Sequence, residues 1–330
     1  MRVEISRGRA PSRAVLAASI GLVIIIWAVN FIAAKIGLRS LPAMTLASFR
    51  VVLAGAVMLP GYLFCSRLPA FAGAAESRRR GLTLRDLWTF LYMGFFGVTI
   101  NQVCFTVGLR YTSVSHAAVI VGVGPIYTLI FAVLFELESG TWRKAMGMAM
   151  AFAGIAVLAS ENGISALSPS VLGDAITMTG SIGFAMYVVL GKRLAGRYDP
   201  LTMTAFSHYA GALLVLPIAI YRAVTLGSAE RWHAIAWTGW AAVLYMAIFS
   251  SAVAYVFYFW VLRFLEASQL SALTYLLPVV ATILGILLLG EKGSWIQVLG
   301  GIMALSGVYW IESGRTSLSG CSSAHRPVDH

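Results

Sequence analysis

The chain has 330 residues, of which 59% are hydrophobic and only 11% are charged. Soluble domains carry about 25% charged residues, so this composition excludes a water-soluble globular protein and predicts an integral membrane protein. The net charge of +11 would favour nucleic-acid binding in a soluble protein. Here the basic residues cluster between apolar runs, a pattern typical of membrane orientation. We therefore expect a lipid bilayer around the chain and no nucleic-acid partner.

Ten apolar runs have the length that a helix needs to cross a bilayer, about 20 residues. They lie near residues 14–34, 43–64, 87–109, 113–135, 142–160, 170–191, 201–221, 234–260, 267–289 and 295–312. The sequence therefore predicts an all-α integral membrane fold with ten transmembrane helices. An arm at 1–13 precedes the runs, and a Ser/Gly/His-rich tail at 313–330 follows them and is expected to be disordered. Between runs, we expect a loop of substantial length only at 65–86.

Lysine and arginine are distributed unevenly between the two sides of the predicted membrane. If the N-terminus is inside, most of the 24 basic residues fall in inner segments. Short loops rich in these residues stay in the cytoplasm, so we expect a multi-pass protein of the inner, or plasma, membrane with both termini cytoplasmic. The basic residues ahead of the first run also fit a signal peptide. The run continues to about Ala34, however, and favours a retained first span.

The two halves of the chain repeat each other. The stretch 109–155 aligns without gaps to 262–308 at an offset of 153 residues. This register pairs Arg110 with Arg263, Ser115 with Ser268, Pro125 with Pro278, Glu138 with Glu291, Trp142 with Trp295, Gly147 with Gly300 and Gly154 with Gly307. The first spans correspond at an offset of 157, which pairs Trp27 with Phe184.

Each half, 14–160 and 161–312, therefore holds five predicted spans. Because five is an odd number, the second half enters the membrane from the opposite side to the first. The sequence thus predicts two inverted-topology five-helix repeats. Many secondary transporters are built this way, with the substrate site at the repeat interface near the middle of the membrane.

Three stretches carry a resemblance to a known family. They are "IIWAVNFIAAKIGL" (25–38), "TLASFRVVLAG" (45–55) and "YLLPVVATILGILLLGEKGSWIQVLGGIMALSGV" (275–308). On these residues the chain resembles the EamA-type permeases of the drug/metabolite transporter superfamily, over about 14–312. One departure is "FELES", where Leu137 precedes Glu138 in place of the usual glycine. The resemblance implies a ten-helix permease whose central cavity serves the export of small metabolites such as amino acids, or of drugs.

Arg50 lies inside the second span, about eight residues past Pro42 and hence roughly 12 Å into the membrane. His208 occupies the corresponding place in the matching span of the second half. A charge at the bilayer centre costs at least about 2.5 kcal/mol, so such residues are candidates for function. Two interpretations stay open. Arg50 attracts a substrate carboxylate or lines its path, or it is a structural arginine bonded to carbonyls of neighbouring helices.

Polar and aromatic residues on other spans complete the candidate pathway. Trp27 and Asn30 share one face of the first span, where they either contact substrate or pack helices together. Gln102 and Tyr255 correspond in the 153-residue register, on the third and eighth spans. Further candidates are His116 and Gln269, which correspond on the fourth and ninth spans, together with Tyr187 on the sixth span and Asn101. The corresponding pair on spans four and nine also fits helix caps, since both residues lie within the first turns.

Pro125 and Pro278 are predicted inside the fourth and ninth spans. A proline there removes one backbone hydrogen bond and kinks the helix. We interpret the pair either as matched hinges or as fixed kinks that shape the bundle.

Small residues recur four apart on the fifth and tenth spans, as Gly147-x-x-x-Ala151 and Gly300-x-x-x-Ala304. Such spacing lets two helices approach closely. It predicts tight packing and leaves a homodimer contact as an alternative.

The chain lacks the usual signatures of other function classes. It has no Walker motif for an ATP-driven pump, and its three cysteines have no metal-binding spacing, so we predict no cofactor and no metal site. No carboxylate is predicted at the centre of any span. The sequence therefore predicts a non-enzymatic secondary transporter that exports a small-molecule metabolite by alternating access. The alternatives are a drug or multidrug efflux permease and a polytopic membrane enzyme acting on lipid-linked substrates.

Overall fold

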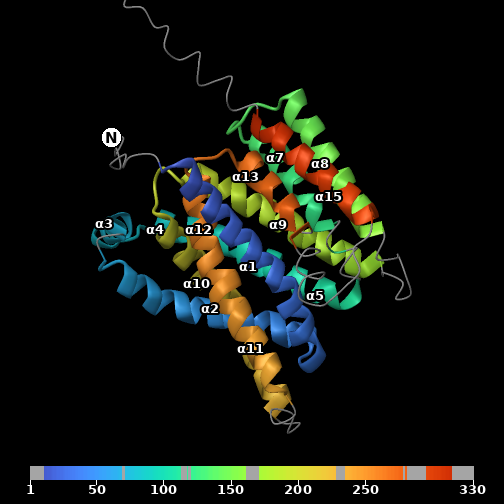
Figure 1. Ribbon diagram of the computed structural model, residues 1–330. Helices are drawn as coiled ribbons and strands as arrows, with labels where there is room; N and C mark the ends of the chain where they lie inside the picture. Colours follow the sequence, from blue (N-terminus) through green and yellow to red (C-terminus); the bar gives the residue numbers. More distant parts are fainter. Residues whose placement is uncertain are drawn as a thin grey trace, which may run out of the picture.

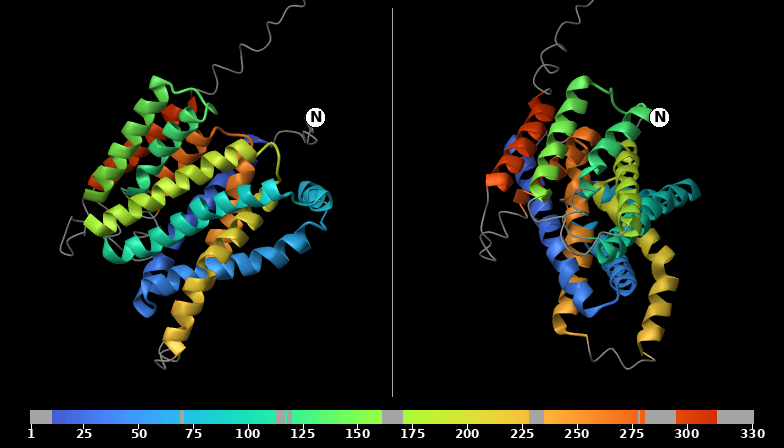
Figure 2. Two further views of the ribbon diagram at one scale, coloured as in Figure 1. Left: turned by 180° about the vertical axis from the view of Figure 1, so that it is seen from behind. Right: turned by 90° about the vertical axis from the view of Figure 1, so that its right-hand side faces the viewer.

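Every regular element that the structure describes is helical, as the apolar runs predict. The computed structural model describes residues 11–68, 71–112, 117, 120–160, 171–227, 235–277, 279–280 and 295–313 (Figures 1 and 2). Within these residues, six helices are long and apolar enough to cross a membrane. They are Arg13–Ser40, Ala43–Cys65, Leu84–Tyr111, Val171–Leu194, Pro200–Leu226 and Trp237–Leu262.

The elements fall into two successive sets. The first set contains α1 (Arg13–Ser40), α2 (Ala43–Cys65), α3 (Ala72–Arg80), α4 (Leu84–Gly94), η2 (Phe95–Val103), α5 (Cys104–Tyr111), α7 (Gly124–Leu134) and α8 (Trp142–Ser160). The second set contains α9 (Val171–Leu194), α10 (Pro200–Gly227), α11 (Trp237–Tyr245), η3 (Met246–Val253), α12 (Ala254–Leu262), α13 (Ala267–Ala272), η4 (Leu273–Tyr275) and α15 (Trp295–Ser313).

The six apolar helices coincide with six of the ten predicted spans. The runs predicted near 142–160 and 295–312 are also helical, as α8 and α15. The runs near 113–135 and 267–289 lie partly outside the described residues, so the count of ten stays a prediction. The arm before residue 11 and the tail beyond 313 also lie outside them.

One local prediction was wrong. The segment 65–86 was expected to be a loop, but Ala72–Arg80 forms the helix α3. Its sequence, AGAAESRRR, is rich in alanine and arginine, which have high helix propensity. Hydropathy alone identified this segment as a break between spans and said nothing about its local preference.

The third and eighth spans each contain a π-helical stretch near the middle. In the third span α4 and α5 flank η2, and in the eighth span α11 and α12 flank η3. Under the 153-residue register, these two stretches overlap. Because π-helical turns are rare and occur often at functional sites, their matched position draws attention to the polar side chains they carry.

Two pairs of helices flank the bundle (Figure 1). α8 packs along α15 at one side, and α2 packs along α10 at the other, while α1, α9 and α12 lie between the pairs (Figures 1 and 2). Glycine allows the close approach of α8 and α15: a Cβ on Gly154 would lie 2.4 Å from the Ala304 nitrogen, and one on Gly307 would lie 2.5 Å from the Ala151 nitrogen. The predicted small-residue faces thus contact each other within one chain.

Candidate functional site

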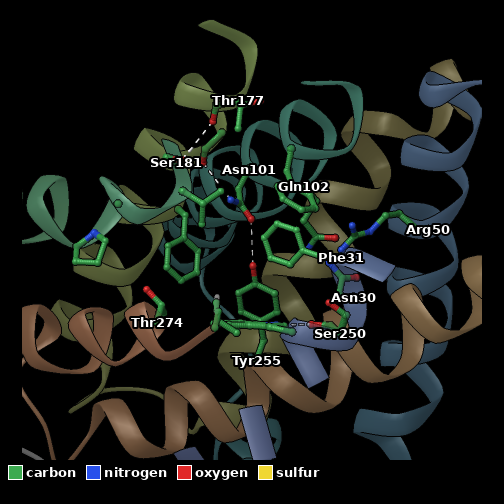
Figure 3. Close-up of a pocket in the computed structure, with 18 residues that line it drawn as sticks. Asn30, Phe31, Arg50, Asn101, Gln102, Thr177, Ser181, Ser250, Tyr255 and Thr274 are labelled. Atoms are coloured by element: carbon green, nitrogen blue, oxygen red, sulfur yellow. Dashed lines mark hydrogen bonds between the residues drawn. The ribbon is translucent and has the colours of Figure 1, made fainter. Parts of the chain in front are cut away.

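A cavity lies where both sets of helices converge (Figure 3). Its volume is about 90 Å³, room for several water molecules or a small solute. The first set of helices and the segment before α7 contribute Trp27, Asn30, Phe31, Arg50, Asn101, Gln102, Phe105, Val121, Gly124 and Pro125. The second set contributes Thr177, Gly180, Ser181, Phe184, Ser250, Tyr255, Thr274 and Leu277.

Arg50 on α2 is the charged side chain among these lining residues. It is 3% exposed. Its Nη1 donates to Thr106 Oγ1 at 3.4 Å and its Nη2 donates to Ser251 Oγ at 3.3 Å, while its Nε has no partner. Among the described residues, none forms a salt bridge with it. The cavity therefore contains a buried cation that is held by two long hydrogen bonds to hydroxyl groups and is not neutralised.

A directed chain of hydrogen bonds continues from Arg50 into the bundle. Ser251 Oγ donates to Gln102 Oε1 at 2.9 Å, and Gln102 Nε2 lies 3.2 Å from His208 Nε2. His208 Nδ1 lies 2.9 Å from the Thr204 carbonyl oxygen, which can only accept. Nδ1 therefore carries the proton, and Nε2 accepts from Gln102. This series of hydrogen bonds orients the Ser251 hydroxyl so that the lone pairs of Ser251 Oγ face the Arg50 guanidinium.

Aromatic side chains form one wall of the cavity. The Trp27 ring centroid lies 5.7 Å from that of Phe184 and 5.3 Å from that of Tyr255. Trp27 Nε1 donates to the Ser250 carbonyl at 3.2 Å, and Tyr255 Oη donates to Asn101 Oδ1 at 3.1 Å. These bonds satisfy the polar ends of both rings and leave their apolar surfaces to the cavity. The sequence register pairs Trp27 with Phe184, and the two meet here.

Hydroxyl groups occur on the side of the cavity away from Arg50, and all of them donate to backbone carbonyls (Figure 3). Thr177 Oγ1 donates to the Gly173 oxygen at 2.8 Å, and Thr274 Oγ1 donates to the Ser271 oxygen at 2.7 Å. Ser181 Oγ donates to the carbonyl oxygen of Thr177 at 3.3 Å. This end therefore presents apolar surface and acceptor lone pairs, with its hydroxyl donors already engaged.

Five of the predicted pathway residues line the cavity. They are Trp27, Asn30, Arg50, Gln102 and Tyr255. Asn101, also a sequence candidate, lines it with them.

Three other candidates lie elsewhere in the bundle or at its end. His208 is fully buried behind Gln102, and Tyr187 is fully buried with its hydroxyl 2.6 Å from Ser207 Oγ. Gln269 belongs to a capping box at the start of α13, where its Oε1 accepts from the Glu266 nitrogen at 3.4 Å. Of the two interpretations of Gln269, pathway residue or helix cap, the structure shows the helix cap.

The two predicted hinge prolines have different outcomes. Pro125 lies in the first turn of α7, just after a local break at Val123 within the apolar helix Ile120–Leu134. Proline is tolerated there, since its missing N–H would have no helical partner. The break just before it fits the predicted kink, while a hinge role for Pro125 stays a prediction, and the residue lines the cavity. Pro278 and the pathway candidate His116 lie outside the described residues.

Sequence reasoning missed the second-half lining residues on α9. Thr177, Ser181 and Phe184 lie at positions i, i+4 and i+7, so they share one face of that helix. This spacing was the available signal, but hydroxyl residues are common in apolar spans and gave no reason to select them. Ser250 and Ser251 were missed for the same reason.

A second charged group, here called the end cluster, consists of Glu138, Lys144, Glu266 and Ser268. Lys144 Nζ lies 3.1 Å from Glu138 Oε2 and 2.7 Å from Glu266 Oε2. Glu138 Oε1 also accepts from the Ser268 nitrogen at 3.2 Å, and Ser268 Oγ donates to Glu138 Oε2. The cluster ties the loop between α7 and α8 to the start of α13. Every charge in it has a partner of opposite sign.

Two more contacts lie beside the end cluster. Lys192 Nζ, at the end of α9, donates to the carbonyl oxygens of Leu262 and Leu265 at 2.9 and 2.5 Å. Arg263 Nη2 lies 3.8 Å from Asp199 Oδ2. Burial raises the pKa of the Asp199 carboxyl, and the nearby Arg263 guanidinium acts in the opposite direction. Together these contacts join the ends of α9 and α12 to the start of α10.

Comparison with known proteins gives matches over most of the chain. Residues 15–160 and 171–313 each match the model of the EamA-like transporter family. A crystal structure superposes with a TM-score of 0.69 over 93% of this chain and 99% of its own, at 18% identity. That likeness concerns the fold alone.

Several transporters from bacteria and archaea are similar in sequence. An uncharacterized transporter of Archaeoglobus fulgidus is 26% identical over 292 residues, covering 88% of this chain and 94% of the relative. The transporter YyaM of Bacillus subtilis is 27% identical over 264 residues, covering 79% of this chain and 82% of the relative. A protein of Streptantibioticus cattleyicolor named "Probable terminal-alkyne amino-acid exporter" is 26% identical over 290 residues, covering 88% of this chain and 91% of the relative.

Proposed function

Because the chain belongs to the EamA-like transporter family, we propose that it is a secondary transporter that exports small metabolites, such as amino acids or their derivatives, by alternating access. The observation that carries this proposal is the central cavity, which both matched stretches line and which contains the unneutralised cation of Arg50. A buried charge in a membrane protein is costly, so it is a candidate functional group by default. An anionic group on the substrate would neutralise Arg50.

Two inverted five-helix repeats are the architecture that we propose for this mechanism. Reciprocal contacts between α8 and α15 support it: a Cβ on Gly147 would lie 3.0 Å from the Gly307 oxygen, and one on Gly154 would lie 2.7 Å from the Gly300 oxygen. Since the sequence register pairs Gly147 with Gly300 and Gly154 with Gly307, each contact is the two-fold image of the other. The pair α2 and α10 supports it also, because Gly55 meets Ala212 at the offset of 157.

We place the protein in the inner, or plasma, membrane with both termini cytoplasmic, which the distribution of lysine and arginine supports. The end cluster is then a cytoplasmic contact between the two halves, and its opening admits substrate from the inside. Export is supported by the relative from Streptantibioticus cattleyicolor, which is named as a probable amino-acid exporter.

A multidrug efflux permease for cationic compounds is disfavoured by the same cavity. Its aromatic wall suits an apolar drug, but the charged lining side chain is Arg50, which repels a cation. A lipid-linked enzyme is disfavoured too, because the similar proteins are named as transporters.

Counterflow in reconstituted vesicles tests the proposal. Proteoliposomes loaded with one member of a metabolite panel (amino acids, nucleobases, short carboxylic acids) are diluted into buffer with the same labelled compound outside. We expect the label to accumulate transiently for an amino acid and to remain outside protein-free liposomes. If no compound of the panel exchanges above that background, the transport proposal is wrong.

A further inference from the structure

Two residues that line the cavity each have one buried polar atom without a hydrogen-bond partner, and the two atoms are complementary. Arg50 Nε is a donor and Asn30 Oδ1 is an acceptor. Both side chains are more than nine-tenths buried, at 3% and 6% exposed, and both lie on the same side of the cavity in Figure 3. A buried polar group without a partner costs about 1–3 kcal/mol, so two of opposite kind in one cavity call for a ligand that satisfies both.

From this pair we infer that the cavity binds the zwitterionic head of an α-amino acid with a small apolar side chain, with its carboxylate on Arg50 and its ammonium on Asn30. This inference rests on the proposed transport function and specifies the substrate class of the same site. The carboxylate accepts from Arg50 Nε and from guanidinium hydrogens that Thr106 and Ser251 leave unused, since arginine offers five N–H donors. A bidentate contact of this kind is among the strongest hydrogen bonds in proteins.

The ammonium group donates to Asn30 Oδ1. The rings of Trp27 and Tyr255 line the cavity with it, and aromatic faces attract a cation. A carboxylic acid without an amino group leaves the Asn30 oxygen unpaired. A dianion such as a phosphate ester fits less well, because Arg50 is the one cation among the lining residues that the structure describes.

The far side of the cavity determines which side chain is accepted. Val121, Phe184 and Leu277 add apolar surface to the lining of the cavity. The hydroxyls of Thr177, Ser181 and Thr274 already donate to backbone carbonyls, so they offer no hydrogen to a substrate. An acidic side chain of the bound amino acid would find no hydrogen-bond donor and no cation among these residues. An aliphatic side chain needs neither and would not be destabilised there.

Calorimetric titration of the purified full-length protein with three related compounds tests the inference. The compounds are L-leucine, 4-methylpentanoate, which lacks the amino group, and 3-methylbutylamine, which lacks the carboxylate. We expect the wild-type protein to bind leucine about tenfold or more tightly than either analogue, because each analogue leaves one buried group unpaired. Equal affinity for leucine and either analogue would overturn the assignment.

Two variants separate the two halves of the head group. With Arg50→Gln, the affinity for leucine is expected to fall at least to that for 3-methylbutylamine, whose own affinity should not fall, because the variant removes a cation that repels its ammonium group. With Asn30→Leu, the affinity for leucine is expected to fall to the affinity for 4-methylpentanoate. The affinity of this variant for 4-methylpentanoate itself should equal that of the wild type. The variant Gln269→Leu, which changes a helix cap outside the cavity, serves as the control and should bind all three compounds as wild type does.

Gel filtration checks that each variant is folded. A selective loss of affinity, for leucine but not for the matching analogue, excludes general misfolding as the cause. If either cavity variant weakens all three compounds equally, the head-group assignment is wrong. The outcome is also separable from that of the transport proposal. If another metabolite shows counterflow and leucine does not bind, only the head-group assignment is wrong. If no compound of the panel shows counterflow, the transport proposal is wrong.

Discussion

Arg50 and Lys144 are both buried basic side chains, but their surroundings are opposite. Lys144 in the end cluster lies within 3.1 Å of two carboxylates, Glu138 and Glu266. Within the described part of the chain, Arg50 in the cavity hydrogen-bonds to only two hydroxyl groups, at 3.3 and 3.4 Å. The protein thus neutralises a charge where it holds two segments together and leaves one unneutralised where a solute can enter. From this difference we propose that Lys144 is structural and that Arg50 is available for binding.

Matched substitutions to methionine give the most direct test of this contrast. Lys144→Met removes the cation that bonds to Glu138 and Glu266 and leaves only the more distant Lys192 near the two carboxylates. Breaking a buried ion pair in this way costs about 3–5 kcal/mol. We expect a melting temperature in detergent that is lower by about ten degrees, since each kcal/mol shifts it by about 2–4 °C in a domain of 150–250 residues. An unchanged melting temperature would show that the end cluster does not hold the bundle.

Arg50→Met is expected to behave in the opposite way. It removes a buried cation without leaving a carboxylate unpaired, so the melting temperature should stay equal or rise. Transport should fall by about 100-fold, because a charge-assisted contact to substrate is lost. The control is Arg222→Met, which changes a cation that donates to Thr45 away from the cavity lining. If Arg50→Met lowers stability as much as Lys144→Met does, Arg50 is structural and the contrast fails.

Gln102→Leu tests the support behind Arg50. The change leaves the Ser251 hydroxyl and His208 Nε2 without their amide partner, which costs about 1–3 kcal/mol per group. We expect about tenfold weaker transport together with a modest loss of thermal stability. Counterflow and melting curves on the same preparation measure both effects. An increase in KM without any change in melting temperature would assign Gln102 to direct substrate contact instead.

Gln269→Leu should have the smallest effect of this series. Its side chain caps the start of α13, and losing a cap costs about 1 kcal/mol. We expect a small drop in melting temperature and unchanged counterflow. A large loss of transport would return Gln269 to the list of pathway residues.

Much of the fold and the centre of the site could be predicted from the sequence. The six long spans follow from apolar length, and Arg50, Asn30 and Gln102 were selected because polar groups inside such spans are costly. What could not be predicted was the rotation of each helix. His208 faces Gln102 instead of the cavity, and Ser181 faces the cavity although an isolated serine in a span gives no sign of it. Such facing depends on contacts between helices and on the phase of the π-helical stretches.

The π-helical stretches also have a consequence for how related chains are compared. A wide helical turn accommodates one residue more than an ordinary one, so the segments 95–103 and 246–253 can gain or lose a residue with the flanking turns kept in place. Single-residue gaps in alignments of this family are therefore expected inside these two segments more often than elsewhere in the same spans. Each such gap would point Gln102 or Ser250 in a new direction, and a single insertion or deletion could then change which substrate the cavity accepts.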